Sequence, residues 1–217
     1  MKPSSKIKVK RIPKRGFYDK ETIYPILDAN FICQIAFMYE GYPVIIPTIY
    51  GRLGDSIYIH GATVSRMLVT LEKGLPISIN VMQTNGIVLA RSAFHHSLNY
   101  ESVTVFGNAT IITSEEERYK ALEVISNQII PGRWEEVRLP SDKELKATKI
   151  LKIEINEASA KIRTGPPGDE KEDYNLPIWA GVIPLKTVAL KEISDPLLNN
   201  GISISKSVHD YIKNNSI

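Results

Sequence analysis

Cysteine is almost missing from this 217-residue chain, in which Cys33 is the single one. One thiol cannot close a disulfide within the chain or supply a multi-cysteine metal site, so a reducing compartment, the cytoplasm, is expected. No run of about 18 apolar residues is present, so we expect no membrane-spanning helix. The basic N-terminus is not followed by an apolar segment, and no secretory signal is expected.

Several enzyme signatures are also missing. The chain has no GxSxG elbow, no GxxxxGK[ST] P-loop, no GxGxxG fingerprint and no HExxH pair. The adjacent His95 and His96 would face opposite ways on a strand, so they are not expected to share a metal ion. Cys33 lies in an apolar segment, which favours an inert buried thiol over a nucleophile.

The net charge of +3 conceals an uneven distribution. Residues 1–15 hold seven Lys and Arg side chains and no acidic one, which leaves 20 basic against 24 acidic residues, or about −4, elsewhere. A nucleic-acid-binding domain normally shows a basic stripe on its folded face, so nucleic acid is not the expected partner. We interpret residues 1–15 as a basic arm, either solvated or paired as an edge strand.

The composition that is present, with 43% hydrophobic and 24% charged residues, is typical of a soluble globular domain. Aromatic and β-branched runs at 31–39, 43–50 and 56–60, separated by short turns, predict an antiparallel meander. Alternating residues at 76–82, 87–91 and 100–112 predict further strands, and Asn85-Gly86 predicts a hairpin turn between the first two of these. Six β segments around a short helix at 64–73 favour a small, mainly β barrel.

Flanking helices are predicted from capping signals. Asp19 is a candidate N-cap for a helix reaching Asn30, and Ser114 begins a helix whose buried face carries Leu122, Ile125 and Ile129. The box from Ser141 to Glu144 predicts a short helix before a strand at 149–157. The chain therefore divides into the arm (1–15), a barrel domain with helical insertions (16–190) and a polar C-terminal tail (191–217).

The segment from Tyr58 to Met67 is the most informative for chemistry. A strand leads into a glycine-containing loop, and Ser65-Arg66 then stands at the first turn of a helix. Free backbone N–H groups, a hydroxyl and a guanidinium around one point would form a phosphate site. A helix cap beside a solvated charge is the alternative reading of the same residues.

The order of these segments resembles the pyridoxamine 5′-phosphate oxidase-like family of FMN-binding split β-barrels. The resemblance lies in PVIIPTIYG, SIYIHG, SRM, LPISINV and NYESVTVFGNA, and covers roughly residues 11–185. LARSAFHHSLNY, PGRW and SAKIRTGPP are closest to the flavin-nucleotide-binding and nitroimidazole-resistance-like branch. The resemblance implies a six-stranded antiparallel split barrel that forms a homodimer with two FMN sites at the subunit interface.

Carried over residue by residue, the resemblance places the flavin ring against the backbone of one strand and its phosphate at the helix start. Met67 stands where the oxidase has a second basic residue, and Trp179 resembles the tryptophan that a partner subunit lays against the flavin. A plain core aromatic is the other reading of Trp179. The implied cofactor contacts are Ile45, Ile46, Pro47, Thr48, Ile49, Tyr50, His60, Gly61, Ser65, Arg66, Met67, Ser102 and Trp179.

The resemblance also implies limits on the reaction. The oxidase follows its tryptophan with an Arg-x-His pair, whereas here Val182 to Leu185 offer no cation, so oxidation of pyridoxamine 5′-phosphate is not expected. We expect an FMN-dependent oxidoreductase, similar to a nitroreductase or flavin reductase, passing electrons to a small planar acceptor, with a nicotinamide nucleotide as one candidate donor. His95 and His96 are candidates for the substrate pocket or for a structural role. A flavin carrier without turnover, and a degenerate barrel that binds haem, are the alternatives.

Overall fold

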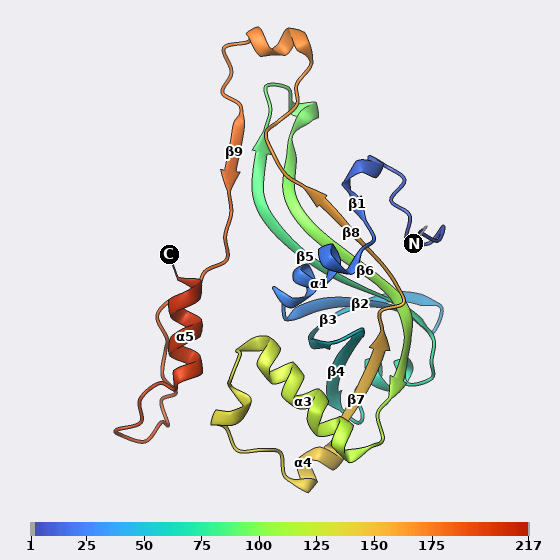
Figure 1. The fold of residues 1–217 in the computed structure, drawn as a ribbon, viewed down its shortest axis with the longest axis vertical. Helices are drawn as coiled ribbons and strands as arrows, with labels where there is room; N and C mark the ends of the chain where they lie inside the picture. Colours follow the sequence, from blue (N-terminus) through green and yellow to red (C-terminus); the bar gives the residue numbers. More distant parts are fainter. Residues whose placement is uncertain (1–2, 217) are drawn as a thin grey trace.

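Six antiparallel strands close into a ring in the computed structural model, which describes residues 3–216. Around the ring each strand pairs with the next, and β6 returns to β5 to close it (Figure 1). The predicted six-stranded barrel is therefore confirmed. In ring order the strands are β2 (Ile32–Tyr39), β3 (Tyr42–Leu53), β4 (Ser56–Ala62), β7 (Thr148–Glu154), β6 (Ser97–Ile111) and β5 (Pro76–Leu89).

Three further strands extend the ring. β8 (Glu157–Arg163) pairs with β6, β1 (Gly16–Phe17) pairs with β8, and β9 (Gly181–Pro184) pairs with the far end of β5. β5 and β6 are long and curved, so their upper halves rise beyond the ring and carry β9 beside them (Figure 1). The sequence signals do not predict β8, which follows the strand expected at 149–157.

The predicted turn at Asn85-Gly86 is wrong, because β5 runs unbroken past it with an irregularity between Thr84 and Gly86. A Cβ added to Gly86 would lie 2.9 Å from Val182 Cγ1 and 3.1 Å from the Ile183 carbonyl oxygen. The glycine is thus needed for the close approach of β9 rather than for a hairpin. The chain reverses instead around a short 3₁₀ turn, η2 (Ala93–His95).

The helices begin where their caps predicted. Asp19 accepts a hydrogen bond from Thr22 N at α1 (Lys20–Asp28), Ser114 caps α3 (Glu115–Ile129), and Ser141 and Glu144 form the capping box of α4 (Asp142–Ala147). The helix expected at 64–73 is shorter, α2 (Arg66–Leu71). The segment interpreted as a polar tail contains a fifth helix, α5 (Lys206–Asn215). The remaining 3₁₀ turns are η1 (Pro13–Arg15), η3 (Trp134–Glu136) and η4 (Lys171–Asn175).

The core fills the inside of the ring and a second layer lies under α3. Alternate residues of β2, among them Cys33 and Ile35, are fully buried inside the ring with Leu68 of α2. Burial raises the pKa of the Cys33 thiol to about 12, as suits an inert thiol. On the other side of the sheet, Tyr58 of β4 packs with Ile125 of α3. The sheet thus keeps one end of β3 and β4 covered by a helix.

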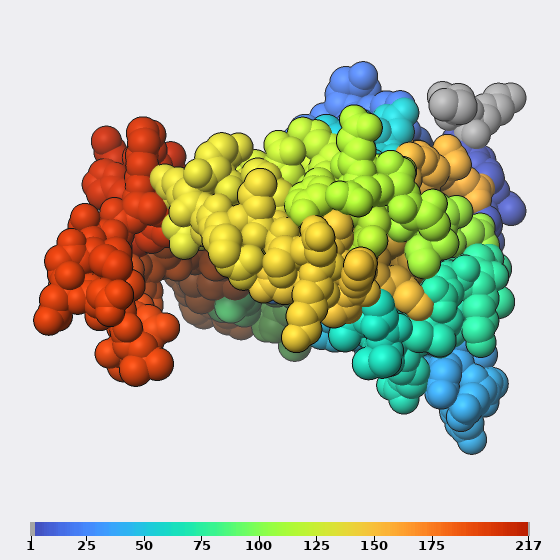
Figure 2. Space-filling view, turned by 90° about the horizontal axis from the view of Figure 1, so that it is seen from below, coloured from blue at the N-terminus to red at the C-terminus, as the bar shows by residue number. Residues whose placement is uncertain are grey.

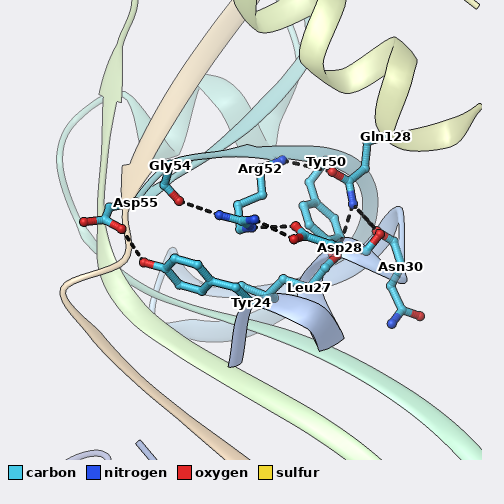
Figure 3. A network of polar contacts seen from close by, with 9 residues as sticks. All are labelled: Tyr24, Leu27, Asp28, Asn30, Tyr50, Arg52, Gly54, Asp55 and Gln128. Carbon is cyan, nitrogen blue, oxygen red and sulfur yellow. Dashed lines mark hydrogen bonds and ion pairs between the residues drawn. The ribbon is translucent and has the colours of Figure 1, made fainter. Parts of the chain in front are cut away.

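A polar network fixes this covered end (Figure 3). Arg52 of β3 makes a bidentate pair with Asp28 at 2.5 Å for both bonds and stacks on Tyr24, with its guanidinium carbon 4.3 Å from the ring centroid. The Gln128 amide of α3 donates to three carbonyl oxygens, those of Leu27, Asp28 and Asn30, at the end of α1. β3 is therefore held firmly between α1 and α3.

The C-terminal segment leaves β9 and docks α5 beside the segment after α3 (Figure 2). Ser207 N donates to Glu136 Oε1 at 3.0 Å, and the Ser207 hydroxyl donates to the other carboxylate oxygen. Hydroxyl hydrogen bonds from Ser205 and Ser207, with the Ser207 backbone N–H, lower the pKa of Glu136 to about 2. Within residues 3–216, no helix combines the length and apolar character that crossing a bilayer requires.

Candidate cofactor site

β3 and β4 separate partway along their length, and the separation leaves an open backbone edge. β3 pairs with β2 from Tyr42 to Ile49, but with β4 only from Tyr50 to Leu53. Among the described residues, the second edge of β3 from 42 to 49 therefore has no strand partner. Alternate N–H and C=O groups along that edge point away from β2 and are available to a flat heterocycle. Ile45 to Ile49 on this edge belong to the stretch that the resemblance assigns to the flavin ring, whereas Tyr50, the last residue of that stretch, pairs with Ile59.

The end of β4 and the start of α2 face the same separation. Gly61 lies against Leu68 of α2, because a Cβ added to Gly61 would lie 3.1 Å from Leu68 Cδ1. Ser65 occupies the N-cap position of α2 without making a side-chain cap hydrogen bond, so its hydroxyl is uncommitted. The exposed Arg66 lies over Tyr39, its guanidinium carbon 5.1 Å from the ring centroid. A hydroxyl and a planar cation therefore stand together at the point predicted for a phosphate.

Two of the predicted contacts are core residues. Met67 is 6% exposed and packs inside the ring, so its side chain does not replace the missing basic residue. Tyr50 is fully buried and its hydroxyl donates to Leu27 O at 2.5 Å. Helix periodicity explains Met67, because one turn of α2 must bury its inner face while Arg66 points outward.

The outer face of the sheet beside this edge carries exposed apolar side chains, and the C-terminal segment lies over one end of it. Tyr50 and Ile59 are paired across β3 and β4, and both side chains lie in the core. Because side chains alternate along a strand, Ile49 and His60 point to the outer face. Ile45 is 67% exposed and Met82 is 59% exposed on the same side. We call the set Ile32, Met38, Ile45, Ile49 and Met82 the open face.

His60 differs from the other histidines in having no polar partner. Its Nδ1 is buried without a hydrogen bond, and burial lowers the pKa of the ring, which keeps it neutral. His96 Nδ1 accepts from Ala90 N at 3.0 Å, so the ring proton is on its Nε2. His95 Nε2 lies 3.4 Å from Glu170, and His209 lies 3.3 Å from Asp210. Neutral imidazole is the form that binds a metal.

The structure does not bring Ser102 and Trp179 to the β3 edge of the same chain. Ser102 accepts a hydrogen bond from Asn80 Nδ2 at 3.1 Å and pairs with Met82 of β5. Its strand, β6, is three strands along the ring from β3. At about 4.8 Å per strand the separation is about 14 Å. Trp179 lies next to β9, 66% exposed, with its ring against Gly181. His95 and His96 lie at the tip of the β5–β6 hairpin.

A cavity of about 740 Å³ lies between the open face and the C-terminal segment. Ile32 and Met82 belong to its lining on the sheet side, and residues 185–189 with Tyr211 form the opposite side. A volume of this size is in the range of small-molecule and cofactor pockets. Sequence reasoning missed it, because the segment after 190 showed no pattern that linked it to the sheet.

The ring of six strands with a separated β3–β4 pair defines the split-barrel class of flavoprotein folds. The family model described as pyridoxamine 5′-phosphate oxidase matches residues 19–162, and the chain belongs to this family. No curated protein matches the chain.

Two solved structures are similar to this chain over nearly its whole length. The flavocytochrome Anf3 from Azotobacter vinelandii is 37% identical with a TM-score of 0.91, covering 96% of this chain and 97% of its own. The FAD and haem binding protein from Mycobacterium smegmatis is 34% identical with a TM-score of 0.87, covering 91% and 97%. A 5-nitroimidazole antibiotic resistance protein from Bacteroides thetaiotaomicron is 21% identical, with a TM-score of 0.54, and shares the fold. The match covers 68% of this chain and 87% of that protein.

Proposed function

We propose that this chain is a redox protein that binds a flavin along the open edge of β3 and a haem beside it. The observation that carries the proposal is the similarity over more than 90% of the chain to two proteins named for these cofactors. Flavin and haem supply hydride and single-electron transfer, while the protein supplies position and electrostatics. The predicted oxidoreductase activity, with a small planar acceptor, is part of this proposal.

The residues at the β3 edge fit a flavin. Backbone groups from 45 to 49 can meet the polar edge of the ring, and exposed Ile45 and Ile49 offer apolar surface to its face. Arg66 and the free hydroxyl of Ser65 can hold the phosphate, because a guanidinium gives charge and directed donors together. These residues bind and orient the cofactor rather than react.

The resemblance implies FMN, and the sequence has no dinucleotide fingerprint to hold an adenylate. The name of the mycobacterial relative favours FAD, which carries the same ring and the same first phosphate. We therefore propose FAD and keep FMN as the alternative outcome. Titration of the apo-protein with each flavin, monitored by quenching of flavin fluorescence, distinguishes them. A tenfold higher affinity for one flavin identifies it as the cofactor.

The haem part of the proposal rests on His60. Of the four histidines, all within the described residues, His60 alone has no hydrogen-bond or charge partner and is held neutral by burial. It lies on the outer face of β4, opposite Ile150 of β7 and next to the point where β3 and β4 separate. His60→Ala should abolish the Soret band while flavin absorbance stays. His209→Ala, on exposed α5, is the control and should keep both. An unchanged Soret band in His60→Ala would place the ligand elsewhere.

A second copy of the chain would complete the site. The open face is apolar and exposed, Trp179 is 66% exposed, and Ser102 lies about 14 Å from β3 within one chain. A homodimer that covers the open face would bring these groups of one copy toward the β3 edge of the other. Pyridoxamine 5′-phosphate is not proposed as substrate, since Val182 to Leu185 offer no cation to its phosphate.

A further inference from the structure

We propose that the basic arm, defined from here as residues 3–15, is the docking surface for a small acidic redox protein that delivers electrons to this chain. The inference rests on the proposed redox function and adds the class of its partner. It starts from a cationic segment that the cofactor site does not use.

The arm is held in place rather than free. Ser4 Oγ donates to Glu157 Oε1 at 2.6 Å, and Lys6 Nζ lies 2.5 Å from the second oxygen of the same carboxylate. Val9 N donates to the Tyr18 hydroxyl at 2.8 Å, and the Val9 side chain occupies the space above Gly16. Because these contacts fix the backbone, the charges of the arm are presented in a set arrangement, unlike those of a solvated tail.

The charges themselves are unpaired. Four exposed cations of the arm take part in none of the ion pairs formed among residues 3–216, and Lys6 is the arm residue that does. Outside residues 1–15 the chain is acidic by about four charges. A cationic segment on an acidic body orients an approaching anionic partner and accelerates association. The four residues are Lys8, Lys10, Arg11 and Lys14.

The arm leads directly to the sheet that carries the proposed cofactor site. Gly16 pairs with Lys161 of β8, and Lys161 pairs with Ser102 of β6, which is opposite Met82 of the open face. Burial and the neighbouring charge of Arg15 lower the pKa of Arg163 at the end of β8. The arm therefore joins the outer edge of the same sheet two strands from Ser102, the residue that the proposed homodimer would bring toward the β3 edge of the other copy (Figure 1).

The features of the arm favour an acidic protein over other polyanions. Residues 1–15 contain no aromatic side chain on which bases could stack, and none that could enter a membrane interface. Its apolar residues Ile7, Val9 and Ile12 are half-buried against the body rather than free to insert. Transient redox complexes use small, charge-matched interfaces below about 1,200 Å², and a held segment with four unpaired cations is suited to one.

The test uses a plant-type [2Fe–2S] ferredoxin, a small acidic redox protein, as probe. Its binding to full-length protein is measured by surface plasmon resonance in low and high salt, and its rate of reducing the bound flavin by stopped flow. One variant carries Lys8→Gln, Lys10→Gln, Arg11→Gln and Lys14→Gln. The matched control removes the same charge from α4 and the C-terminal segment, with Lys143→Gln, Lys146→Gln, Lys191→Gln and Lys213→Gln.

The arm variant should bind ferredoxin at least tenfold more weakly in low salt, with the difference vanishing in high salt, and the control should stay within threefold of wild type. Changing the four arm residues to Glu should create binding to a basic cytochrome c. An arm variant that binds ferredoxin like wild type would overturn the proposal. If that variant instead loses binding to duplex DNA or to phosphatidylserine vesicles, the arm binds that polyanion and not an acidic protein, which also overturns the proposal. The binding measurement does not need flavin, so an absent cofactor would count against the proposed function alone.

Discussion

Arg66 is the residue on which the proposed flavin site depends most. It is exposed at the first position of α2, with Tyr39 under its guanidinium, and its neighbour Met67 is buried and cannot replace its charge. Losing a charged hydrogen-bond partner costs about 1.5–3 kcal/mol, so Arg66→Ala should weaken flavin binding roughly 10- to 150-fold. Calorimetric titration of apo-protein measures the change.

Two further variants define the role of Arg66. Arg66→Lys should lose less than Arg66→Ala, because the charge remains while the planar geometry is lost. Arg138→Ala removes an exposed arginine that pairs with Glu144 away from the site, and it should leave flavin affinity unchanged. Binding by Arg66→Ala within twofold of wild type would show that the phosphate lies elsewhere.

At the scale of elements, the contact between α3 and β3 depends on Gly51. A Cβ at this position would lie 2.8 Å from backbone atoms of Ile125 and Val124, which cannot rotate away. Gly51→Ala should therefore push α3 from the sheet and lower the free energy of unfolding by about 1–3 kcal/mol. Gly168→Ala is the control, since no atom lies within 4 Å of the added group. Urea unfolding of both variants measures the difference, and equal midpoints would contradict the packing.

The docking of α5 should depend on pH through Glu136. Its pKa is about 2 when the helix is docked and near 4.5 otherwise, so the carboxylate stabilises the docked helix fully above pH 4.5. That stabilisation is lost as the pH falls from 4.5 toward 2. Proteolysis of the C-terminal segment should accelerate over this window, and Glu136→Gln should show the acid behaviour already at pH 7. Cleavage of wild type and Glu136→Gln at equal rates at pH 7 would refute the coupling.

Elements with strong local signals were predictable from the sequence, and elements that depend on distant contacts were not. Asp19, Ser114 and Ser141 cap their helices as expected, and aromatic and β-branched runs together with alternation indicated five strands of the ring. Asn85-Gly86 has the composition of a turn, but β9 approaching from about 100 residues away makes it part of a strand. Arg66 was found from its motif, whereas the isolation of His60 and the cavity under residues 185–189 arise from tertiary packing.

At the scale of the whole molecule, the open face predicts a dimer. β2, β3 and β5 each carry exposed apolar residues on this face, which an obligate interface of about 2,000 Å² or more would cover. Sedimentation velocity at micromolar concentration should give a dimer. Ile45→Arg, which puts a charge at the centre of this surface, should shift it to monomer and lower flavin affinity with it. A flavin-loaded monomer of the wild type would contradict the shared site.

The visible spectrum of freshly purified protein, with mass identification of the released cofactors, tests the central claim most directly. The proposed function predicts flavin bands together with a Soret band, and masses that correspond to one flavin and one haem per chain. A colourless protein that takes up neither cofactor on reconstitution would contradict it.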